Sequence, residues 1–436
     1  MKRTILFTLL LAVVATSFAQ NVNQPSAENL KARQEFADNK FGIFIHWGIS
    51  SLFAQGEWYF NRKKLSQQEY KKAADAFYPH RFDAKAWVSA FKDAGAKYIC
   101  FTTRHHDGFS MWDSQYTDYD MVDATPFKRD IVGELAAECH RQGLKFHAYY
   151  SHMDWSRDDY PGGRFGGRVT DLDHFEGGWQ NYYNFMNNQL AELITKYDID
   201  AVWFDAMGDH RNDPTPFDWQ LDEQYAMIRS LKPSCLIGNN HHLSNVDRED
   251  FQIFERDIPG ENKGGFSEGV EVSNKKPLET CQTMNKSWGY KVSDQNYKST
   301  KTLIRYLVST SGKGANLLLN VGPQPNGELP AAALVRLKEM GEWLRANGET
   351  IYATTAGDIP QQEWGVTTRK GNRLFVHIFD LKSQELHLPL SCKVSKAFAY
   401  DSKQAVKFVK SKEGGITLKF DEVPSGIDYI VELITK

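Results

Sequence analysis

The sequence is poor in cysteine, and its cysteines form no recognisable pairs. Among 436 residues there are five, with no CxxC motif: Cys100, Cys139, Cys235, Cys281 and Cys392. An odd and scattered set argues against a disulfide framework. Cys100 lies in an apolar run and Cys139 on a predicted helical face, so we expect buried free thiols.

The chain also lacks an excess of basic side chains. It contains 52 lysines and arginines against 55 aspartates and glutamates, a formal net charge of −3 at pH 7. A nucleic-acid-binding protein is more often basic, with its positive charge clustered in a patch. The composition therefore predicts no nucleic-acid partner.

Long apolar runs are confined to the start of the sequence. Residues 1–19, MKRTILFTLLLAVVATSFA, have a basic beginning, a short apolar stretch and small residues before Gln20. This pattern is typical of a secretory signal peptide, and its apolar stretch is too short to span a membrane. No cysteine follows it that could carry a lipid. We predict cleavage after Ala19 and a secreted or periplasmic protein without a membrane anchor.

Aromatic residues, in contrast, are plentiful. They make up 13% of the chain and include 11 tryptophans, and many of them stand beside polar clusters. A pyranose packs its apolar face on an aromatic ring, while its hydroxyl groups need hydrogen-bond partners. The composition is thus typical of a sugar-binding protein.

Short apolar runs alternate with helical patterns over most of the chain. The predicted strands lie at 41–48, 97–109, 144–151, 200–209, 235–240, 250–257 and 316–323. The predicted helices lie at 83–95, 130–143, 180–196, 218–231, 299–311 and 331–346. Continuous apolar strands separated by helices indicate a parallel sheet covered on both faces. About eight such units in roughly 320 residues favour the α/β class and a (β/α)8, or TIM, barrel.

The pattern changes past about residue 355. Short alternating strands follow, separated by turn signals such as Lys370-Gly371-Asn372 and Gly414-Gly415. They predict a small antiparallel β-sandwich. We therefore expect a catalytic barrel domain over residues 20–354 and a C-terminal sandwich domain over 355–436. Within the barrel domain, the segment 259–277 is expected to form a mobile loop.

Polar and aromatic side chains stand at the ends of the predicted strands. They are His46, Trp47, His105, His106, Tyr149, Tyr150, Trp203, Asp205, Asn239, Asn240 and Glu255. Barrel active sites lie at the carboxyl ends of the strands, so these side chains are predicted to converge on one mouth.

Two of these residues are carboxylates that suit glycoside hydrolysis. Asp205 ends the run AVWFD, where it could attack an anomeric carbon or, alternatively, cap the next helix. Glu255 stands beside Phe254, and an apolar setting raises a carboxyl pKa toward that of a general acid. An ion pair with Arg256 is the alternative for Glu255. Other carboxylates compete for the acid's role: Glu249, Asp250, Glu271 and Glu279. A separation of about 5–5.5 Å between nucleophile and acid would mean retention of configuration through a covalent intermediate.

Eight motifs, in order and with similar spacing, resemble the family 29 α-L-fucosidases. They are FGIFIHWG, GEWY, TTRHHDGFSMW, KRDIVGEL, YYSHMDW, VWFD, SWGY and NLLLNVGP, and they cover most of residues 35–355. The resemblance implies a (β/α)8-like barrel followed by a β-sandwich. It also implies an exo-acting, retaining α-L-fucosidase that needs no cofactor and whose substrate is a fucosylated oligosaccharide or glycoconjugate.

The resemblance also implies roles for individual residues. Asp205 matches the family's nucleophile, and Glu255 matches its acid/base in the branch with an Asp-Phe pair upstream, here Asp250-Phe251. The residues that match those holding fucose are His46, Glu57, Trp58, His105, His106 and Tyr149. Trp203 matches an aromatic residue in the nucleophile's strand, and Trp288 stands where an aromatic packs near the C5 methyl group.

The sequence departs from the family at GNNHH. His241 is expected where many members carry an arginine, which is always charged whereas a histidine is not.

The adjacent histidines raise the alternative of a metallohydrolase. Metal ligation by His105 and His106 would need further ligands in suitable geometry, so we predict hydrogen bonds to sugar hydroxyl groups and no metal. A purely structural role for at least one of the two histidines is the remaining alternative. Two further alternatives stay open at this point. One is the same fold acting only on branched fucosylated motifs or on another sugar. The other is a catalytically silent carbohydrate-binding protein, against which the presence of both Asp205 and Glu255 argues.

Overall fold

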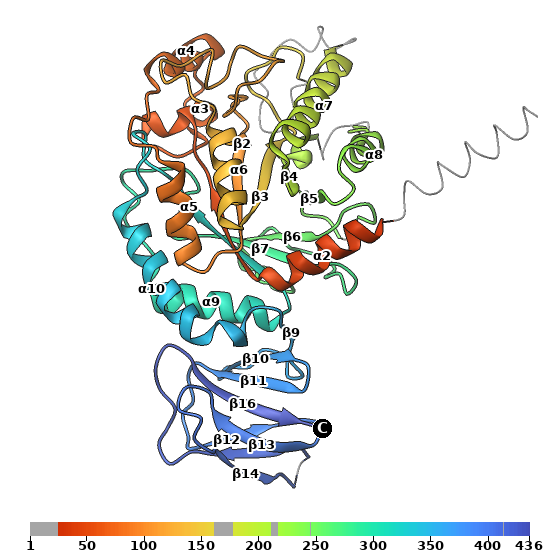
Figure 1. The fold of residues 1–436 in the computed structure, drawn as a ribbon, viewed down its shortest axis with the longest axis vertical. Coiled ribbons are helices and arrows are strands. Elements are labelled where there is room, and N and C mark those ends of the chain that lie inside the picture. Colours follow the sequence, from red (N-terminus) through yellow and green to blue (C-terminus); the bar gives the residue numbers. More distant parts are fainter. Residues whose placement is uncertain (1–24, 161–177, 211–216, 245, 413) are drawn as a thin grey trace, which may run out of the picture.

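A sheet of eight parallel strands forms the centre of the larger part of the molecule (Figure 1). The computed structural model describes residues 25–160, 178–210, 217–244, 246–412 and 414–436, so the predicted signal peptide lies outside the described residues. The strands are β1 (Phe41–Ile45), β2 (Tyr98–Arg104), β3 (Lys145–Ser151), β4 (Ala201–Asp205), β5 (Leu236–Asn240), β6 (Gln252–Glu255), β7 (Leu278–Thr283) and β8 (Asn316–Val321). Their order is β5-β4-β3-β2-β1-β8-β7-β6, so the sheet curls into a nearly closed barrel.

The barrel closes where β5 meets β6. The backbone N–H of Asp250 donates to the carbonyl oxygen of Ile237 at 2.7 Å, and the N–H of Ile237 donates to the Asp250 carboxylate at 2.7 Å. That buried carboxylate also pairs with Arg33 at 2.5 Å and with Arg229 at 3.2 Å. One aspartate thus joins the two end strands and binds two cations from surrounding helices.

Helices surround the barrel. The longer ones are α2 (Ala27–Asn39), α5 (Ala84–Asp93), α6 (Ile131–Gln142), α7 (Gly178–Tyr197), α8 (Leu221–Leu231), α9 (Thr300–Gly312) and α10 (Ala331–Asn347). The shorter ones are η1 (Ile49–Phe53), α3 (Tyr59–Arg62), α4 (Gln67–Lys71), η2 (Lys72–Ala76), η4 (Met207–His210) and η5 (Gly348–Thr350). Local signals set the ends of two predicted helices: Asp83 caps α5 by accepting from the N–H of Ala86 at 2.9 Å, and Gly143 ends α6 with φ +79°. No described helix is long and apolar enough to cross a membrane.

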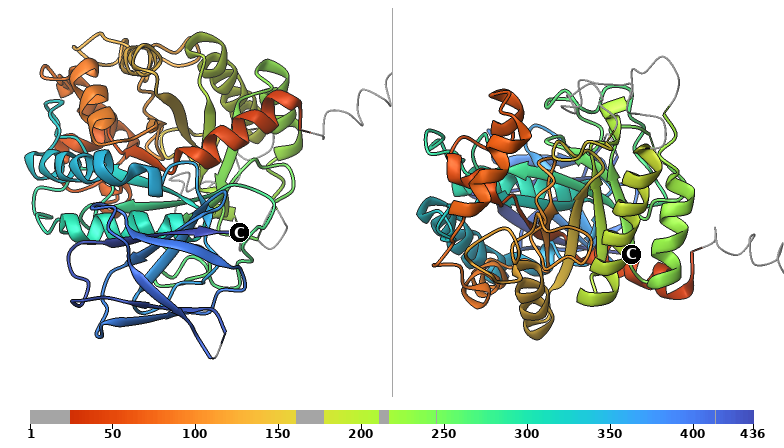
Figure 2. Two further views of the ribbon diagram at one scale, coloured as in Figure 1. Left: turned by 60° about the horizontal axis from the view of Figure 1, so that its bottom comes forward. Right: turned by 90° about the horizontal axis from the view of Figure 1, so that it is seen from above.

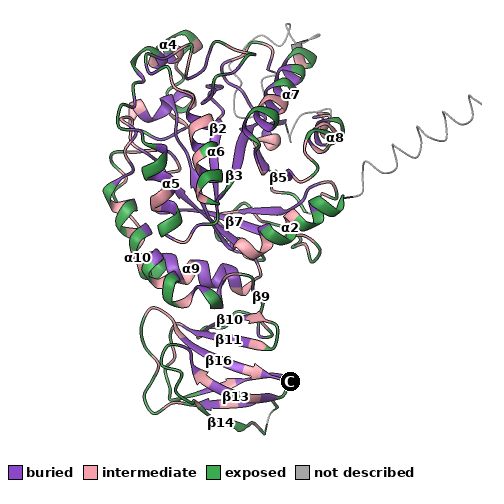
Figure 3. Cartoon of the chain, in the orientation of Figure 1, coloured by how far each residue is buried: buried purple, intermediate pink, exposed green. Residues whose placement is uncertain are grey.

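Both faces of the sheet are buried, as Figure 3 shows. Alternate side chains of a strand point to opposite faces. On β1, Phe44 faces the barrel interior and contacts Tyr149 and Trp203, while Ile43 and Ile45 belong to the core under the helices. This double burial explains the continuous apolar runs in the sequence.

Helix α2 covers the amino-terminal end of the barrel. Its residue Phe36 is buried against Tyr98 and Phe251, with ring centroids 5.4 and 4.6 Å away. The barrel interior is therefore filled with side chains at this end. An open cavity can lie only at the opposite end, at the carboxyl ends of the strands.

Strand β7 was missed by the sequence analysis, which assigned no strand between 258 and 315. Its sequence, LETCQT, alternates polar residues without an apolar run. Glu279 points into the interior and accepts hydrogen bonds from Tyr98 Oη and from Trp203 Nε1 (2.8 Å), so the strand is buried although it is polar. Residues 259–277, the predicted loop, contain no helix or strand.

The C-terminal part consists of two antiparallel sheets, ordered β13-β16-β11-β10-β9 and β12-β15-β14. The strands are β9 (Thr355–Ala356), β10 (Gly365–Lys370), β11 (Arg373–Ile378), β12 (Glu385–Leu388), β13 (Val394–Ala399), β14 (Lys407–Lys410), β15 (Ile416–Lys419) and β16 (Tyr429–Thr435). A separate apolar core lies between them, and helix α9 lies against this part (Figure 2). The predicted sandwich is confirmed, whereas the domain boundary after residue 354 stays a prediction. All five cysteines are free, and all but Cys392 are buried.

Candidate active site

A cavity of about 1130 Å³ opens at the carboxyl ends of the barrel strands. Ten of the eleven residues that the sequence analysis assigned to catalysis or fucose binding line it, and His241 does not: His46, Glu57, Trp58, His105, His106, Tyr149, Trp203, Asp205, Glu255 and Trp288. Of the other side chains at predicted strand ends, Asn240 lines the cavity, whereas Trp47, Tyr150 and Asn239 do not. Strand alternation explains part of the set, because Phe44 on β1 and His46 just after it share the inward face, as do Trp203 and Asp205 on β4. No described residue of the C-terminal sandwich lines this cavity.

One amide nitrogen joins the two candidate catalytic carboxylates. Asn240 Nδ2, at the end of β5, lies 3.2 Å from Asp205 Oδ1 and 2.9 Å from Glu255 Oε2. Since both oxygens contact the same atom, they are at most about 6 Å apart. The shared donor therefore favours the close spacing of retaining glycosidases, about 5–5.5 Å, over the 6.5–9.5 Å spacing of inverting ones.

Three donors hold Asp205 in place. Besides Asn240, the hydroxyl group of Tyr149 donates to Oδ2 at 2.7 Å, and the backbone N–H of Ala206 donates to Oδ1 at 2.8 Å. Burial raises the pKa of this carboxyl group, while the hydrogen bonds from Tyr149, Ala206 and Asn240 lower it. The donors thus favour the ionised, nucleophilic form that burial opposes.

Glu255 is held in the opposite state. Its pKa is raised to about 7, chiefly by burial and next by the charge of Asp205, while the hydrogen bond from Asn240 opposes the rise. His242 Nε2 lies 3.7 Å from Glu255 Oε2, and Arg256 Nε lies 3.9 Å from Oε1. A buried carboxyl group beside an ionised one keeps its proton near neutral pH, which suits a general acid.

The competing carboxylates occupy other places. Glu249 pairs with His241 outside the cavity, and Asp250 joins β5 to β6. Glu271 is exposed and does not line the cavity, and Glu279 lies in the barrel interior below Trp203. Of the four candidates and Glu255, only Glu255 therefore reaches the cavity that Asp205 lines.

Backbone strain marks the ends of three neighbouring strands. Ala206, His242 and Arg256 follow β4, β5 and β6, and their φ angles are +68°, +56° and +61°. A residue other than glycine in this region costs roughly 1–2 kcal/mol. Such strain persists where surrounding structure fixes it, and it is common around active sites.

The hydrogen bonds of His46 and His106 define which ring nitrogen carries the proton. Asn320 donates through Nδ2 to the carbonyl oxygen of Trp288, so its Oδ1 accepts from His46 Nδ1 at 2.7 Å. The Ser151 hydroxyl group donates to the Met153 carbonyl oxygen and accepts from His106 Nδ1 at 2.7 Å. Burial lowers the pKa of both histidines to about 3, so each is neutral with an unprotonated Nε2. Both can accept a hydrogen bond from a hydroxyl group.

Aromatic rings complete this side of the cavity. The ring of His105 stacks on Tyr149 at 5.5 Å and 10°, and burial lowers its pKa well below the usual value. Trp58 meets His106 edge to face at 5.3 Å. Glu57 is buried, and its Oε2 accepts from the N–H of Gly289 at 2.7 Å.

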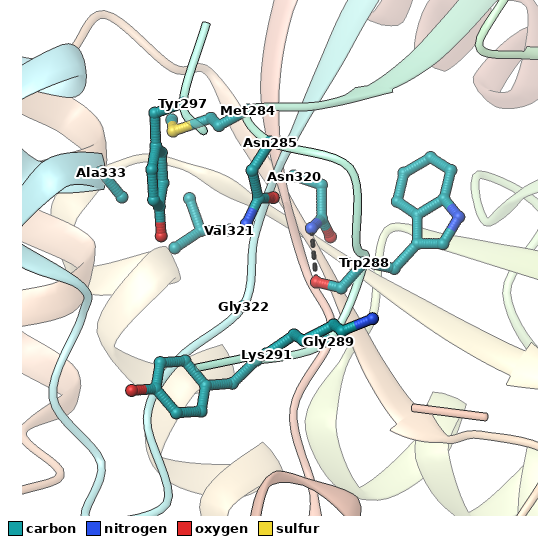
Figure 4. Close-up of a pocket in the computed structure, with 11 residues that line it drawn as sticks. Met284, Asn285, Trp288, Gly289, Lys291, Tyr297, Asn320, Val321, Gly322 and Ala333 are labelled. Atoms are coloured by element: carbon teal, nitrogen blue, oxygen red, sulfur yellow. Dashed lines mark hydrogen bonds between the residues drawn. The ribbon is translucent and has the colours of Figure 1, made fainter. Parts of the chain in front are cut away.

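Trp288 is presented by the loop after β7, which packs closely against β8. Asn320 Nδ2 donates to the Trp288 carbonyl oxygen at 2.7 Å. Figure 4 shows this bond as a dashed line and the indole ring pointing away from the small void behind it. That void holds about 10 Å³, enough for one water molecule at most. The ring instead stacks on His46 at 5.1 Å and lines the large cavity.

The likeness to known proteins agrees with this geometry. The sequence family described as "Alpha-L-fucosidase" matches residues 10–349. The chain belongs to the α-L-fucosidase family. It is 31% identical over 363 residues to the plasma α-L-fucosidase of Pongo abelii, which covers 76% of this chain and 72% of that protein.

Solved α-L-fucosidases share the fold. Isoenzyme 1 from Paenibacillus thiaminolyticus superposes with a TM-score of 0.83 and 34% identity, covering 94% of this chain and all of that one. A family 29 α-L-fucosidase from Bacteroides thetaiotaomicron, a trapped covalent intermediate with 2-fluoro-fucosyl fluoride, gives 0.81 and 27%, covering 93% and 96%. The chain is accordingly an enzyme, a glycoside hydrolase of this family.

Within the α-L-fucosidase cavity, the structure does not place His241 where the sequence predicted. His241 is buried, with Nε2 3.0 Å from Glu249 Oε2 and Nδ1 accepting from the N–H of Leu243, and it does not line the cavity. Its neighbour His242 lines the cavity instead, because its positive φ turns the chain after β5. The sequence contained one signal of this ambiguity, the HH pair itself.

Further cavity residues were not singled out from the sequence. Asn240 had been noted only as a strand end, and Arg256 only as an alternative ion-pair partner. Phe266 and Glu268, from the predicted loop, also line the cavity. Among the described residues no group of three histidine, cysteine or carboxylate side chains could hold a metal ion.

Proposed function

We propose that the protein is an exo-acting, retaining α-L-fucosidase that hydrolyses terminal α-L-fucose from glycans. The observation that carries the proposal is the Asn240 bridge, which limits the separation of the Asp205 and Glu255 oxygens to about 6 Å. This short bridge supports a retaining reaction, in which one carboxylate attacks the sugar directly and no water molecule has to fit between sugar and base in the first step.

In the first step, Asp205 attacks the anomeric carbon while Glu255 donates its proton to the glycosidic oxygen. The bond between carbon and leaving group breaks, and the aglycone leaves as an alcohol. A β-linked fucosyl ester of Asp205 remains. The donors from Tyr149, Ala206 and Asn240 support this assignment because they favour the ionised nucleophile.

In the second step, ionised Glu255 takes a proton from water, and the resulting hydroxide equivalent attacks the anomeric carbon. The ester bond breaks and α-L-fucose is released, so two inversions give net retention. Glu255 ends protonated and Asp205 ionised. The elevated pKa of Glu255, about 7, supports its alternation between acid and base.

The cavity walls suit a single terminal sugar. Phe44 and Trp203 close the floor, which supports exo action, since a chain cannot pass through. His46 and His106 offer unprotonated nitrogens to sugar hydroxyl groups, and the remaining wall residues assigned to the fucose are Glu57, Trp58, His105, Tyr149, Trp203 and Trp288. Trp288 supplies an apolar surface for the C5 methyl group.

The alternatives are weaker. A carbohydrate-binding protein without catalytic activity does not need two carboxylates held by a shared donor. An enzyme restricted to branched fucosylated motifs would carry out the same reaction on fewer substrates. We include in the proposal that residues 1–19 direct secretion. The enzyme would then encounter its fucosylated glycans outside the cytoplasm.

The test is release of 4-nitrophenol from its α-L-fucoside by the wild type and by Asp205→Ala, with and without azide. We expect wild-type activity, its loss in the variant by at least about 1,000-fold, and partial recovery with azide as β-L-fucosyl azide. Activity of the variant close to wild type would refute Asp205 as nucleophile. Wild-type inactivity on this substrate and on fucosylated oligosaccharides would refute the function.

A further inference from the structure

One aromatic residue of the cavity wall, Phe266, is not among the residues assigned to the fucose. Phe266 lies on the segment between β6 and β7, lines the cavity and remains 40% exposed. The other large aromatic rings at the mouth, Trp58 and Trp288, contact His106 and His46, on the side of the proposed fucose ligands. Phe266 contacts a different element.

The partner of Phe266 is His242. Their rings stack with centroids 5.1 Å apart and planes at 25°. His242 Nε2 in turn lies 3.7 Å from Glu255 Oε2. Phe266 therefore stands on the acid/base side of the cavity, and the imidazole supports one face of its ring.

The strained backbone of His242 fixes this support. Its φ of +56° brings the ring onto the cavity wall, and a non-glycine residue adopts that conformation at a cost of roughly 1–2 kcal/mol. Stacking on Phe266 links the strand end to the segment 264–268, whose Gly264, Gly265 and Glu268 also line the cavity.

We propose that Phe266, supported by His242, binds the first sugar of the leaving group through the apolar face of that pyranose. The inference rests on the proposed function. Glu255 must reach the glycosidic oxygen, so the leaving sugar begins beside Glu255 and extends away from the fucose ligands. His242 and Phe266 are the next groups on that side, and an exposed ring packs on the C–H face of a hexopyranose.

The test compares two substrates that share fucose but differ in the leaving group. In α-L-fucosyl fluoride the leaving group is a single atom, whereas in a fucosyl disaccharide it is a hexose. The disaccharide is chosen as the best wild-type substrate among fucose linked to galactose or to N-acetylglucosamine. The measured quantity is the ratio of kcat/KM for the disaccharide to kcat/KM for the fluoride.

For Phe266→Ala we expect this ratio to fall about 10-fold, as expected for loss of one stacking contact. Phe266→Trp should restore it to within about 3-fold of wild type, since a ring is again present. Val272→Ala is the matched control, because Val272 is equally exposed at 40% on the same segment and does not line the cavity. We expect the control to keep the wild-type ratio.

The outcomes separate the two claims. A wild type that hydrolyses both substrates, with an unchanged ratio in Phe266→Ala, overturns the leaving-group site and leaves the fucosidase function standing. Equal loss on both substrates also overturns it, because the residue then acts on fucose or on folding. A wild type that hydrolyses neither substrate overturns the function and the site together.

Discussion

Replacing Asn240 with alanine removes the amide that donates to both active-site carboxylates. Its Nδ2 lies 3.2 Å from Asp205 Oδ1 and 2.9 Å from Glu255 Oε2. A hydrogen bond to a carboxylate stabilises the ionised form and lowers its pKa, so losing the bond raises the pKa of both groups.

The size of the change follows from the energy of such bonds. A hydrogen bond to a charged group is worth about 1.5–3 kcal/mol, and one pKa unit corresponds to about 1.4 kcal/mol. We expect the pKa of Glu255 to rise by about one unit, and that of Asp205 by less, because its bond is longer. Loss of the donor should also lower kcat/KM at the optimum roughly 10- to 100-fold.

The assay is the pH dependence of kcat/KM for an aryl α-L-fucoside. In the proposed mechanism the reactive enzyme has Asp205 ionised and Glu255 protonated, so activity should rise through the lower pKa and fall through the upper one. In the wild type we expect the descending limb near pH 7, where Glu255 loses its proton. In Asn240→Ala the whole profile should move to higher pH.

A matched control is Asn239→Ala on the same strand. Asn239 Nδ2 donates to Tyr225 Oη at 2.9 Å and contacts neither carboxylate in the described structure. This variant should lose stability but keep the wild-type pH profile. Asn240→Ala with unshifted limbs would contradict the shared-donor account, as would a shift toward lower pH.

Three further predictions concern neighbouring groups. Tyr149→Phe removes the hydroxyl group 2.7 Å from Asp205 Oδ2, so the ascending limb of the pH profile should rise by about one unit; an unmoved limb would contradict this. Asp250→Asn removes the carboxylate that Arg33 and Arg229 share where β5 meets β6, so the free energy of unfolding in urea should fall by about 3 kcal/mol. A fall of less than about 1 kcal/mol would mean that these ion pairs do not stabilise the contact between β5 and β6. Glu255→Ala should slow natural glycans at least about 100-fold more than aryl fucosides with good leaving groups, and equal losses would assign the proton to another residue.

The barrel was predictable because its strands are buried on both faces and therefore appear as apolar runs. Strand β7 escaped because Glu279 and its neighbours are polar, and only the contacts with Tyr98 and Trp203 show that the strand is buried. Nothing in the sequence LETCQT indicates that Glu279 contacts Trp203, which lies 76 residues earlier in the chain.

The candidate site was predictable in part for a similar reason. Side chains at the carboxyl ends of barrel strands lie close together regardless of the loop conformations. Asp205 and Glu255 could therefore be predicted to line the same cavity. The choice between His241 and His242 depended on one backbone angle, which the letters HH do not encode. The bridging role of Asn240 depended on the spacing of three strand ends, a property of the closed barrel and not of any segment.

The most direct measurement of the central claim is the site of covalent labelling by 2-deoxy-2-fluoro-α-L-fucosyl fluoride. The protein, with Glu255→Gln to slow release of the label, is incubated with the reagent, digested and mapped by mass spectrometry. We predict a single fluorofucosyl ester on Asp205, absent from the matching Asp205→Ala protein. A label on another carboxylate, or none under conditions where the wild type hydrolyses α-L-fucosides, would contradict it.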